Sequence, residues 1–104
     1  MENRKILCGA SYYEQKFYLN EAYSSLPQAV RDELKAMCVM FVDEVSGIIM
    51  LEFDDEGNLR IVVTSKPDDF YFDEIGSELK VRQLRNQKRE LFDQLEEYYN
   101  AVSD

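Results

Sequence analysis

The chain of 104 residues contains no histidine, and this absence limits the chemistry that its side chains could perform. Histidine is the commonest general base, the usual activator of a serine or cysteine nucleophile, and the commonest ligand for transition metals. The sequence also contains neither a glycine-rich phosphate-binding loop nor a Gly-x-Ser-x-Gly motif. We therefore predict a protein that is not an enzyme and that holds no cofactor.

Two cysteines, Cys8 and Cys38, are the candidates for a reactive thiol. A thiolate forms where cations surround it, but Cys8 has only Arg4 and Lys5 nearby in sequence. Cys38 lies in an apolar segment, where a free cysteine is usually buried. The two positions fit no metal-binding or redox motif, and lone thiols are typical of a reducing compartment. We expect a cytoplasmic protein without a catalytic cysteine.

Two groups of carboxylates could bind a cation or act as acid and base. The first, at residues 54–56, lies in an expected turn and lacks the glycine and glutamate that an EF-hand calcium loop has where Leu59 and Ser65 stand here. The second surrounds the aromatic residues 70–72. Its members are Asp68, Asp69, Asp73 and Glu74. The ordinary interpretation of both groups is solvated turn acids. The alternative, a metal or small-ligand site at the second group, requires a concave pocket that holds at least two of its carboxylates.

The charge of the chain favours a protein partner. A formal charge of −9, from 21 acidic and 12 basic residues, disfavours binding to nucleic acid or to an anionic membrane, and favours a basic partner. The seven tyrosines add to this, because tyrosine is enriched at interfaces. A local basic stripe of Arg82, Arg85 and Arg89 is interpreted as pairing with acids of the same helix.

The elements of the first half can be predicted from hydrophobic spacing. Residues 6–20 form either one long strand or, as we prefer, a hairpin of residues 6–12 and 16–20. A helix should follow Pro27, capped by Ser25 or Leu26 and ended by Ser46-Gly47. Its apolar stripe is Val30, Leu34, Met37, Phe41 and Val45. A rival interpretation ends this helix near residue 36 and makes residues 38–42 a strand.

The second half predicts a hairpin and a long helix. Apolar, β-branched runs at 48–53 and 59–64 flank a turn at 54–58. A helix is predicted over residues 70–102, beginning in earnest after Gly76 and interrupted in its stripe by Lys88. The fold class is therefore α+β in one domain, residues 1–104. We expect an antiparallel sheet of three to four strands, in the order ββαββα, with two helices on one face.

The length of the last helix suggests a self-association surface. A helix of about 30 residues is about 45 Å long, whereas a domain of this size has a radius of gyration near 13 Å. One end should therefore overhang the sheet and meet a second copy of the chain. The candidate interface residues are Leu91, Leu95, Tyr98, Tyr99 and Val102.

Several short segments resemble a family of small uncharacterised proteins from anaerobic Gram-positive bacteria. They are Cys8-Gly9-Ala10-Ser11, Leu26-Pro27 with Asp32-Glu33-Leu34-Lys35, Leu51-Glu52-Phe53-Asp54 with Glu56-Gly57-Asn58, and Asp73-Glu74-Ile75-Gly76-Ser77. The resemblance covers nearly the whole chain and implies no activity. A second, weaker likeness is to acidic immunity proteins of the YezG type, in which a long helix precedes a strand, an acidic turn and a strand. That likeness implies neutralisation of a toxin.

The leading hypothesis is a small cytosolic binding protein that recognises a protein partner or a second copy of itself, with neither nucleic acid nor membrane as a partner. The alternatives are an immunity-like inhibitor of a basic toxin, and a carboxylate site for a metal or small ligand near residues 68–74.

Overall fold

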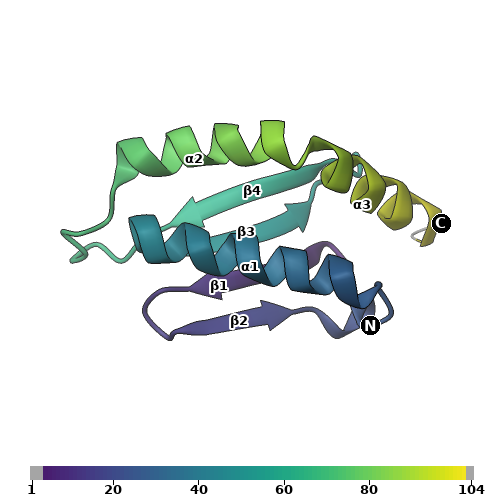
Figure 1. Ribbon diagram of the computed structural model, residues 1–104, viewed down its shortest axis with the longest axis horizontal. Coiled ribbons are helices and arrows are strands. Elements are labelled where there is room, and N and C mark those ends of the chain that lie inside the picture. Colours follow the sequence, from purple (N-terminus) through teal and green to yellow (C-terminus); the bar gives the residue numbers. More distant parts are fainter. Residues whose placement is uncertain (1–3, 103–104) are drawn as a thin grey trace.

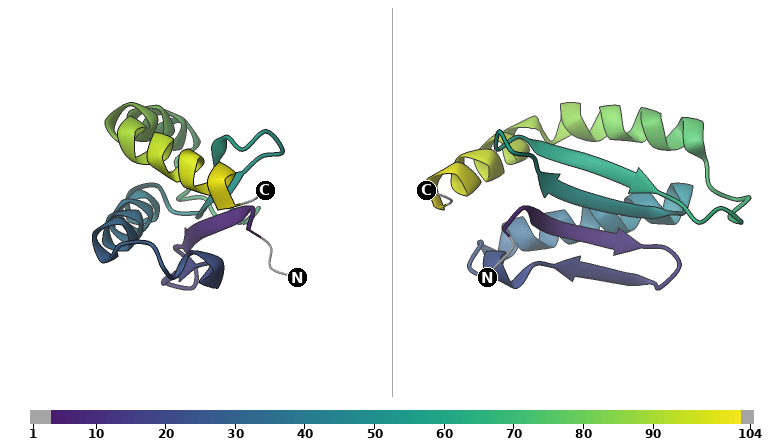
Figure 2. Two further views of the ribbon diagram at one scale, coloured as in Figure 1. Left: turned by 90° about the vertical axis from the view of Figure 1, so that its right-hand side faces the viewer. Right: turned by 180° about the vertical axis from the view of Figure 1, so that it is seen from behind.

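The computed structural model of the chain describes residues 4–102, which form one four-stranded antiparallel sheet with a layer of helices. In chain order the elements are β1 (Ile6–Ser11), β2 (Lys16–Leu19), the 3-10 helix η1 (Glu21–Tyr23), α1 (Gln28–Val45), β3 (Ile48–Phe53), β4 (Leu59–Thr64), α2 (Glu74–Gln87) and α3 (Arg89–Val102). The strand order is β2-β1-β3-β4. The three α-helices lie on one face, and no helix of residues 4–102 covers the opposite face (Figures 1 and 2).

The first hairpin is confirmed. Strands β1 and β2 pair antiparallel, with Ala10 opposite Phe17. The reversal between them uses no glycine, because Gln15 itself takes a positive φ of 54°. Its side-chain amide donates a hydrogen bond of 2.6 Å to the carbonyl of Tyr12. This local bond stabilises a backbone conformation that residues other than glycine rarely adopt.

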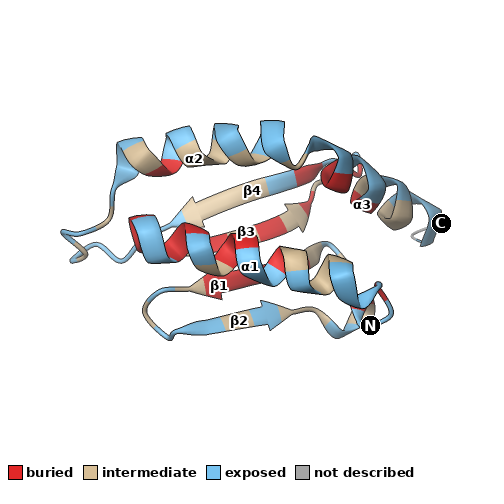
Figure 3. Cartoon of the chain, viewed as in Figure 1, coloured by how far each residue is buried: buried red, intermediate tan, exposed pale blue. Residues whose placement is uncertain are grey.

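Helix α1 runs unbroken through residues 38–42, so the rival interpretation of a strand there is wrong. In this segment Cys38, Phe41 and Val42 are buried, whereas Met40 is 60% exposed, so the helix buries one face against the sheet (Figure 3). The helix starts directly after Pro27, whose carbonyl accepts bonds from the N–H groups of Val30 and Arg31 at 3.0 and 3.1 Å. Neither of the predicted caps, Ser25 and Leu26, occupies the N-cap position, because proline supplies a preset φ for helix entry.

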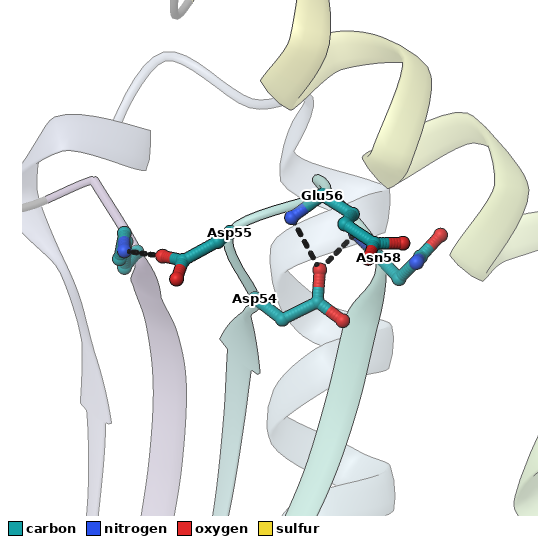
Figure 4. A network of polar contacts seen from close by, with 5 residues as sticks. Asp54, Asp55, Glu56 and Asn58 are labelled. Carbon is teal, nitrogen blue, oxygen red and sulfur yellow. Dashed lines mark hydrogen bonds and ion pairs between the residues drawn. The ribbon is translucent and has the colours of Figure 1, made fainter.

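The second hairpin is confirmed, and Leu51 lies opposite Ile61 in its register. Its acidic turn is held together by Asp54, whose Oδ1 accepts bonds of 2.9 Å from the N–H groups of Glu56 and Asn58 (Figure 4). The hydrogen bond from the Asn58 backbone is the main cause that lowers the pKa of Asp54. Asp55 forms an ion pair with Lys5 of the neighbouring strand segment. The first carboxylate group therefore organises a turn.

The predicted long helix over residues 70–102 is wrong in two respects. It begins at Glu74, earlier than Gly76, because the Asp73 carboxylate caps it by accepting a bond of 2.8 Å from the Gly76 N–H. It also breaks at Lys88, where φ is −109° and ψ is 20°. The Lys88 ammonium donates a bond of 2.8 Å to Glu33 of α1, so this residue turns toward the neighbouring helix. The architecture is therefore α+β with three helices in place of two, in the order ββαββαα.

The break at Lys88 redirects the chain so that α3 packs on the end of the sheet (Figure 1). The rings of Phe53 and Tyr99 stack with centroids 4.1 Å apart, and Tyr98 lies 6.1 Å from Tyr23. The core thus joins the inner face of the sheet, the apolar stripe of α1 and the first turns of α3. None of the helices within residues 4–102 is long and apolar enough to cross a membrane.

Candidate functional site

The residues predicted as a self-association surface on the last helix are mostly used inside the chain. Leu91 and Leu95 are buried, and Tyr98 and Tyr99 are half-buried against the core. Only Val102 is exposed, at 38%. The premise of an overhanging helix is therefore wrong, because the break at Lys88 lets α3 fold back onto its own sheet.

The four predicted acidic residues separate into two pairs. Asp68 and Asp69 line a recess at one end of the sheet. Asp73 caps α2, and Glu74 is the first residue of that helix and lines a different recess, between α2 and β4. The concave pocket required by the metal or ligand hypothesis thus exists for two of the four carboxylates. No group of three or more cysteines, aspartates or glutamates within residues 4–102 is arranged to hold a metal ion.

The recess that contains Asp68 and Asp69 has a volume of about 450 Å³ and lies between the end of α1, the β1–β2 turn and the segment after β4. Its walls carry more acids than bases and several phenol rings. The lining residues with charged or phenolic side chains are Tyr12, Tyr13, Asp43, Glu44, Lys66, Asp68, Asp69 and Tyr71. Glu44 forms an ion pair with Lys80 of α2, and Asp43 and Asp68 are two further exposed carboxylates at the rim.

Asp69 forms the hub of a hydrogen-bond network in this recess. Its Oδ2 accepts bonds of 2.6 Å from both the Ser46 hydroxyl and the Tyr13 hydroxyl. Its Oδ1 accepts a bond of 2.9 Å from the Tyr71 N–H. These bonds, first that from Ser46 and then that from Tyr13, lower the pKa of Asp69. The carboxylate therefore fastens the segment after β4 to the β1–β2 turn and to the end of α1.

Tyr13 carries the network further. Its hydroxyl also accepts a bond of 3.0 Å from the Lys66 N–H, and the Lys66 ammonium lies 4.7 Å from the centre of the Tyr13 ring. Desolvation, followed by the bond to Asp69, raises the pKa of Tyr13. A cation at this distance over a phenol ring is attracted by the ring quadrupole. The recess thus already holds one ammonium group against an aromatic wall.

Residues 65–73, which we call the aromatic loop, are also fixed at their second end. The Asp73 N–H donates a bond of 3.1 Å to the carbonyl of Val45. The Phe72 ring lies close to Gly47, because a Cβ added at residue 47 would be 2.9 Å from an atom of that ring. Phe72 therefore points inward and packs against the core.

Phe70 and Tyr71 point the other way and are the most exposed large hydrophobic side chains in residues 4–102, at 93% and 92%. Two further apolar residues, Ile75 and Leu79, follow on the outer side of α2 with exposures of 75% and 53%. Sequence reasoning placed these aromatics among the acids and did not identify them as a surface. The available signal was that Ile75 and Leu79 lie off the helical stripe of Val81 and Leu84.

The two thiols are poorly suited to nucleophilic chemistry. Cys8 of β1 and Cys38 of α1 are fully buried and neighbour each other between the sheet and the helix. The hydrogen bond with Cys38 and burial both raise the pKa of Cys8, so its thiolate is disfavoured. Burial also keeps both sulfurs away from any substrate in solvent. Two of the predicted acids, Asp68 and Asp69, and the exposed side chain of Tyr71 come together at the acidic recess.

The sheet, the helices and the recess define a small protein of the α+β class. Its four-stranded antiparallel sheet carries three helices on one face, and the aromatic loop is anchored at the end of the sheet. The chain belongs to a family of unknown function (DUF6145), whose model matches residues 4–104. The comparison with curated proteins found no match, and the comparison with solved structures found none either.

Proposed function

We propose that this protein binds a basic protein partner, without catalysing a reaction, through the aromatic loop and the acidic recess beside it. The observation that carries the proposal is the pair Phe70 and Tyr71, which are adjacent in sequence and more than nine-tenths exposed, on a loop fastened at both ends. Large exposed apolar patches rimmed by polar residues mark interaction sites.

The anchoring of the loop supports this interpretation. Interfaces concentrate their binding energy in a few aromatic or arginine residues. Such anchors bind more tightly when they are rigid beforehand, because less conformational entropy is lost on association. The bonds of Asp69 to Ser46, Tyr13 and Tyr71 hold the backbone from which the two aromatic side chains project.

The charge of the recess indicates the chemistry of the partner. Asp43 and Asp68 are exposed at the rim, and Tyr12 and Tyr71 provide ring faces beside them. A lysine or arginine side chain of the partner can form an ion pair with these carboxylates and a cation–π contact with these rings. The net charge of −9 steers a basic partner toward the protein over longer range.

An immunity-like inhibitor of a basic toxin is a special case of this function that the same surface favours. The burial of both unpaired cysteines is consistent with a cytoplasmic location, which we include in the proposal.

Site-specific photo-crosslinking in the native cell tests the proposal. The photoreactive residue p-benzoylphenylalanine is placed at Tyr71, and at Tyr18 as the matched control. Tyr18 is also an exposed tyrosine, at 54%, but it lies on β2, away from the recess. We expect a basic protein to be crosslinked from Tyr71 but not from Tyr18, and the crosslink to disappear in the Phe70→Ala and Asp68→Asn variants. Equal crosslinking from both positions, or none, contradicts the proposal.

A further inference from the structure

Strand β4 forms one edge of the sheet, and the direction of its backbone groups can be worked out from its turn. Asp54 donates its N–H to the carbonyl of Asn58 at 2.9 Å, so these two residues form a hydrogen-bonded pair. Hydrogen-bonded pairs alternate along an antiparallel ladder. The next residue, Leu59, accordingly points its N–H away from β3, and the carboxylate of Glu96 accepts it at 2.7 Å. By the same alternation, Ile61 and Val63 direct their N–H and C=O groups to the outer edge.

These outer groups of Ile61 and Val63 have no hydrogen-bond partner within residues 4–102. The stretch from Ile61 to Thr64 is β-branched throughout and contains neither a charge nor a proline. Natural proteins usually protect exposed edges with lysine, proline or very short strands. The opposite edge follows that rule, because β2 has four residues and begins with Lys16. In β4 the one charged residue is Arg60 near its start, so the stretch from Ile61 to Thr64 has no such protection of its own and could pair with an added strand in the space beneath α2.

A recess of about 500 Å³ lies between this edge and α2, with an apolar floor of Ile61, Val63, Phe72 and Val81. Helix α2 runs antiparallel to β4 and lies along the outer side of the strand (Figures 1 and 2). An extended segment paired with β4 would therefore place every second side chain into the recess, beneath α2. Recognition of a peptide at a strand edge, with alternate side chains in pockets, is an established binding mode.

The rim of the recess carries charges of opposite sign at its two ends. Glu74 and Glu78 lie at the end where β4 finishes. Arg82 lies further along the recess, and Arg85 reaches toward the Leu59 carbonyl at 3.4 Å, at the end where β4 starts. A segment that runs antiparallel to β4 would meet the two glutamates with its first residues and the two arginines with its last residues.

We propose that the β4 edge binds an extended polypeptide segment by strand addition. The segment has a basic residue at its N-terminal end, apolar residues at alternate positions, and an acidic residue at its C-terminal end. The unpaired groups of Ile61 and Val63 give the backbone bonds, the recess takes the apolar side chains, and the charged rim fixes the direction. This surface is separate from the exposed aromatic pair, so the failure of one proposal leaves the other standing.

The test uses the full-length chain and a synthetic probe, acetyl-Lys-Thr-Val-Thr-Val-Thr-Glu-amide, in which the two charged residues and both valines share one face. The probe is titrated by NMR with isotope-labelled protein. We expect the amides of Ile61 and Val63 to shift and to become protected from hydrogen exchange. Methylating those amides of the probe that face β4 should abolish binding, whereas methylating the alternate amides should not. Equal effects of the two methylation patterns would overturn the proposal. It would also be overturned if, without probe, the protection of the Ile61 and Val63 amides rose with protein concentration, because a second copy of the chain would then occupy the edge.

The charged rim is tested by exchanging its signs. In the double variant Glu78→Lys/Arg82→Glu both residues are exposed, and the net charge of the chain is unchanged. We expect this variant to bind the probe about tenfold more weakly or worse, because two favourable charge pairs become repulsive. The control is Arg89→Glu/Glu90→Lys, which makes the same exchange at two exposed positions at the start of α3. Equal affinity of the two variants would overturn the assignment of direction and partner charge.

Discussion

Replacing Gly47 by alanine should release the aromatic loop from the core and lower the free energy of unfolding by about 2–5 kcal/mol. Gly47 has a φ of 82°, a conformation that costs an L-residue about 1–2 kcal/mol. A Cβ at this position would also lie 2.7 Å from the Thr64 carbonyl oxygen and 2.9 Å from the Phe72 ring. The shifts of side chains and backbone that such overpacking forces typically lower the free energy of unfolding by about 1–3 kcal/mol. The two contributions add, because the new atom cannot avoid either.

The assay is equilibrium unfolding in urea, with Gly57→Ala as the matched control. Gly57 has a φ of 83°, so it carries the same backbone cost, but the three atoms nearest to a Cβ there all belong to the side chain of Asn100, which can move away. We expect Gly57→Ala to lose about 1–2 kcal/mol and Gly47→Ala to lose more. Hydrogen exchange should also accelerate at Tyr71 in the Gly47 variant alone. Equal losses in the two variants would refute the argument that Gly47 is packed against Phe72.

Two further predictions concern α3 and the hub of the recess. Leu95→Ala should lower the free energy of unfolding by about 2–5 kcal/mol in urea titrations, because this side chain is 2% exposed in the core. The molar mass in light scattering should stay unchanged, and a fall in mass with little loss of stability would contradict the packing of α3 on its own sheet. Asp69→Asn should remove a pH-dependent part of the stability. Because the folded-state pKa of Asp69 is lowered, its contribution is complete above the ordinary carboxyl pKa near 3.9 and is lost as the pH falls through the folded-state value. The difference between wild type and Asp69→Asn in urea titrations should therefore shrink between pH 7 and pH 3, and a constant difference would count against the hub.

Local periodicity was enough to predict both hairpins and helix α1. Alternation of polar and apolar residues specifies which face of a strand is buried, and the stripe from Val30 to Val45 specifies one face of a helix. These signals come from residues close in sequence. At Lys88 the sequence shows only an interruption of the apolar stripe, which resumes with Leu91 and Leu95, and this does not predict a break in the helix. It is associated with a contact to Glu33, which is 55 residues away.

The candidate site was only partly predictable for the same reason. The sequence identified Asp69 as one of four similar acids, and nothing local distinguishes it from Asp68. Its role comes from the hydroxyls of Tyr13 and Ser46, which are 56 and 23 residues away. Phe70 was also ambiguous, because an aromatic residue in sequence usually indicates core and only the folded chain shows it exposed.

The most direct test of the central claim is the affinity of the purified crosslinked partner for the double variant Phe70→Ala/Tyr71→Ala, measured by calorimetry. If these side chains are the anchors of the interface, their loss should cost at least about 2 kcal/mol, which is about a 30-fold weaker affinity. Tyr18→Ala should bind like the wild type. If the double variant binds as tightly as the wild type, the aromatic loop is not the recognition surface of this protein.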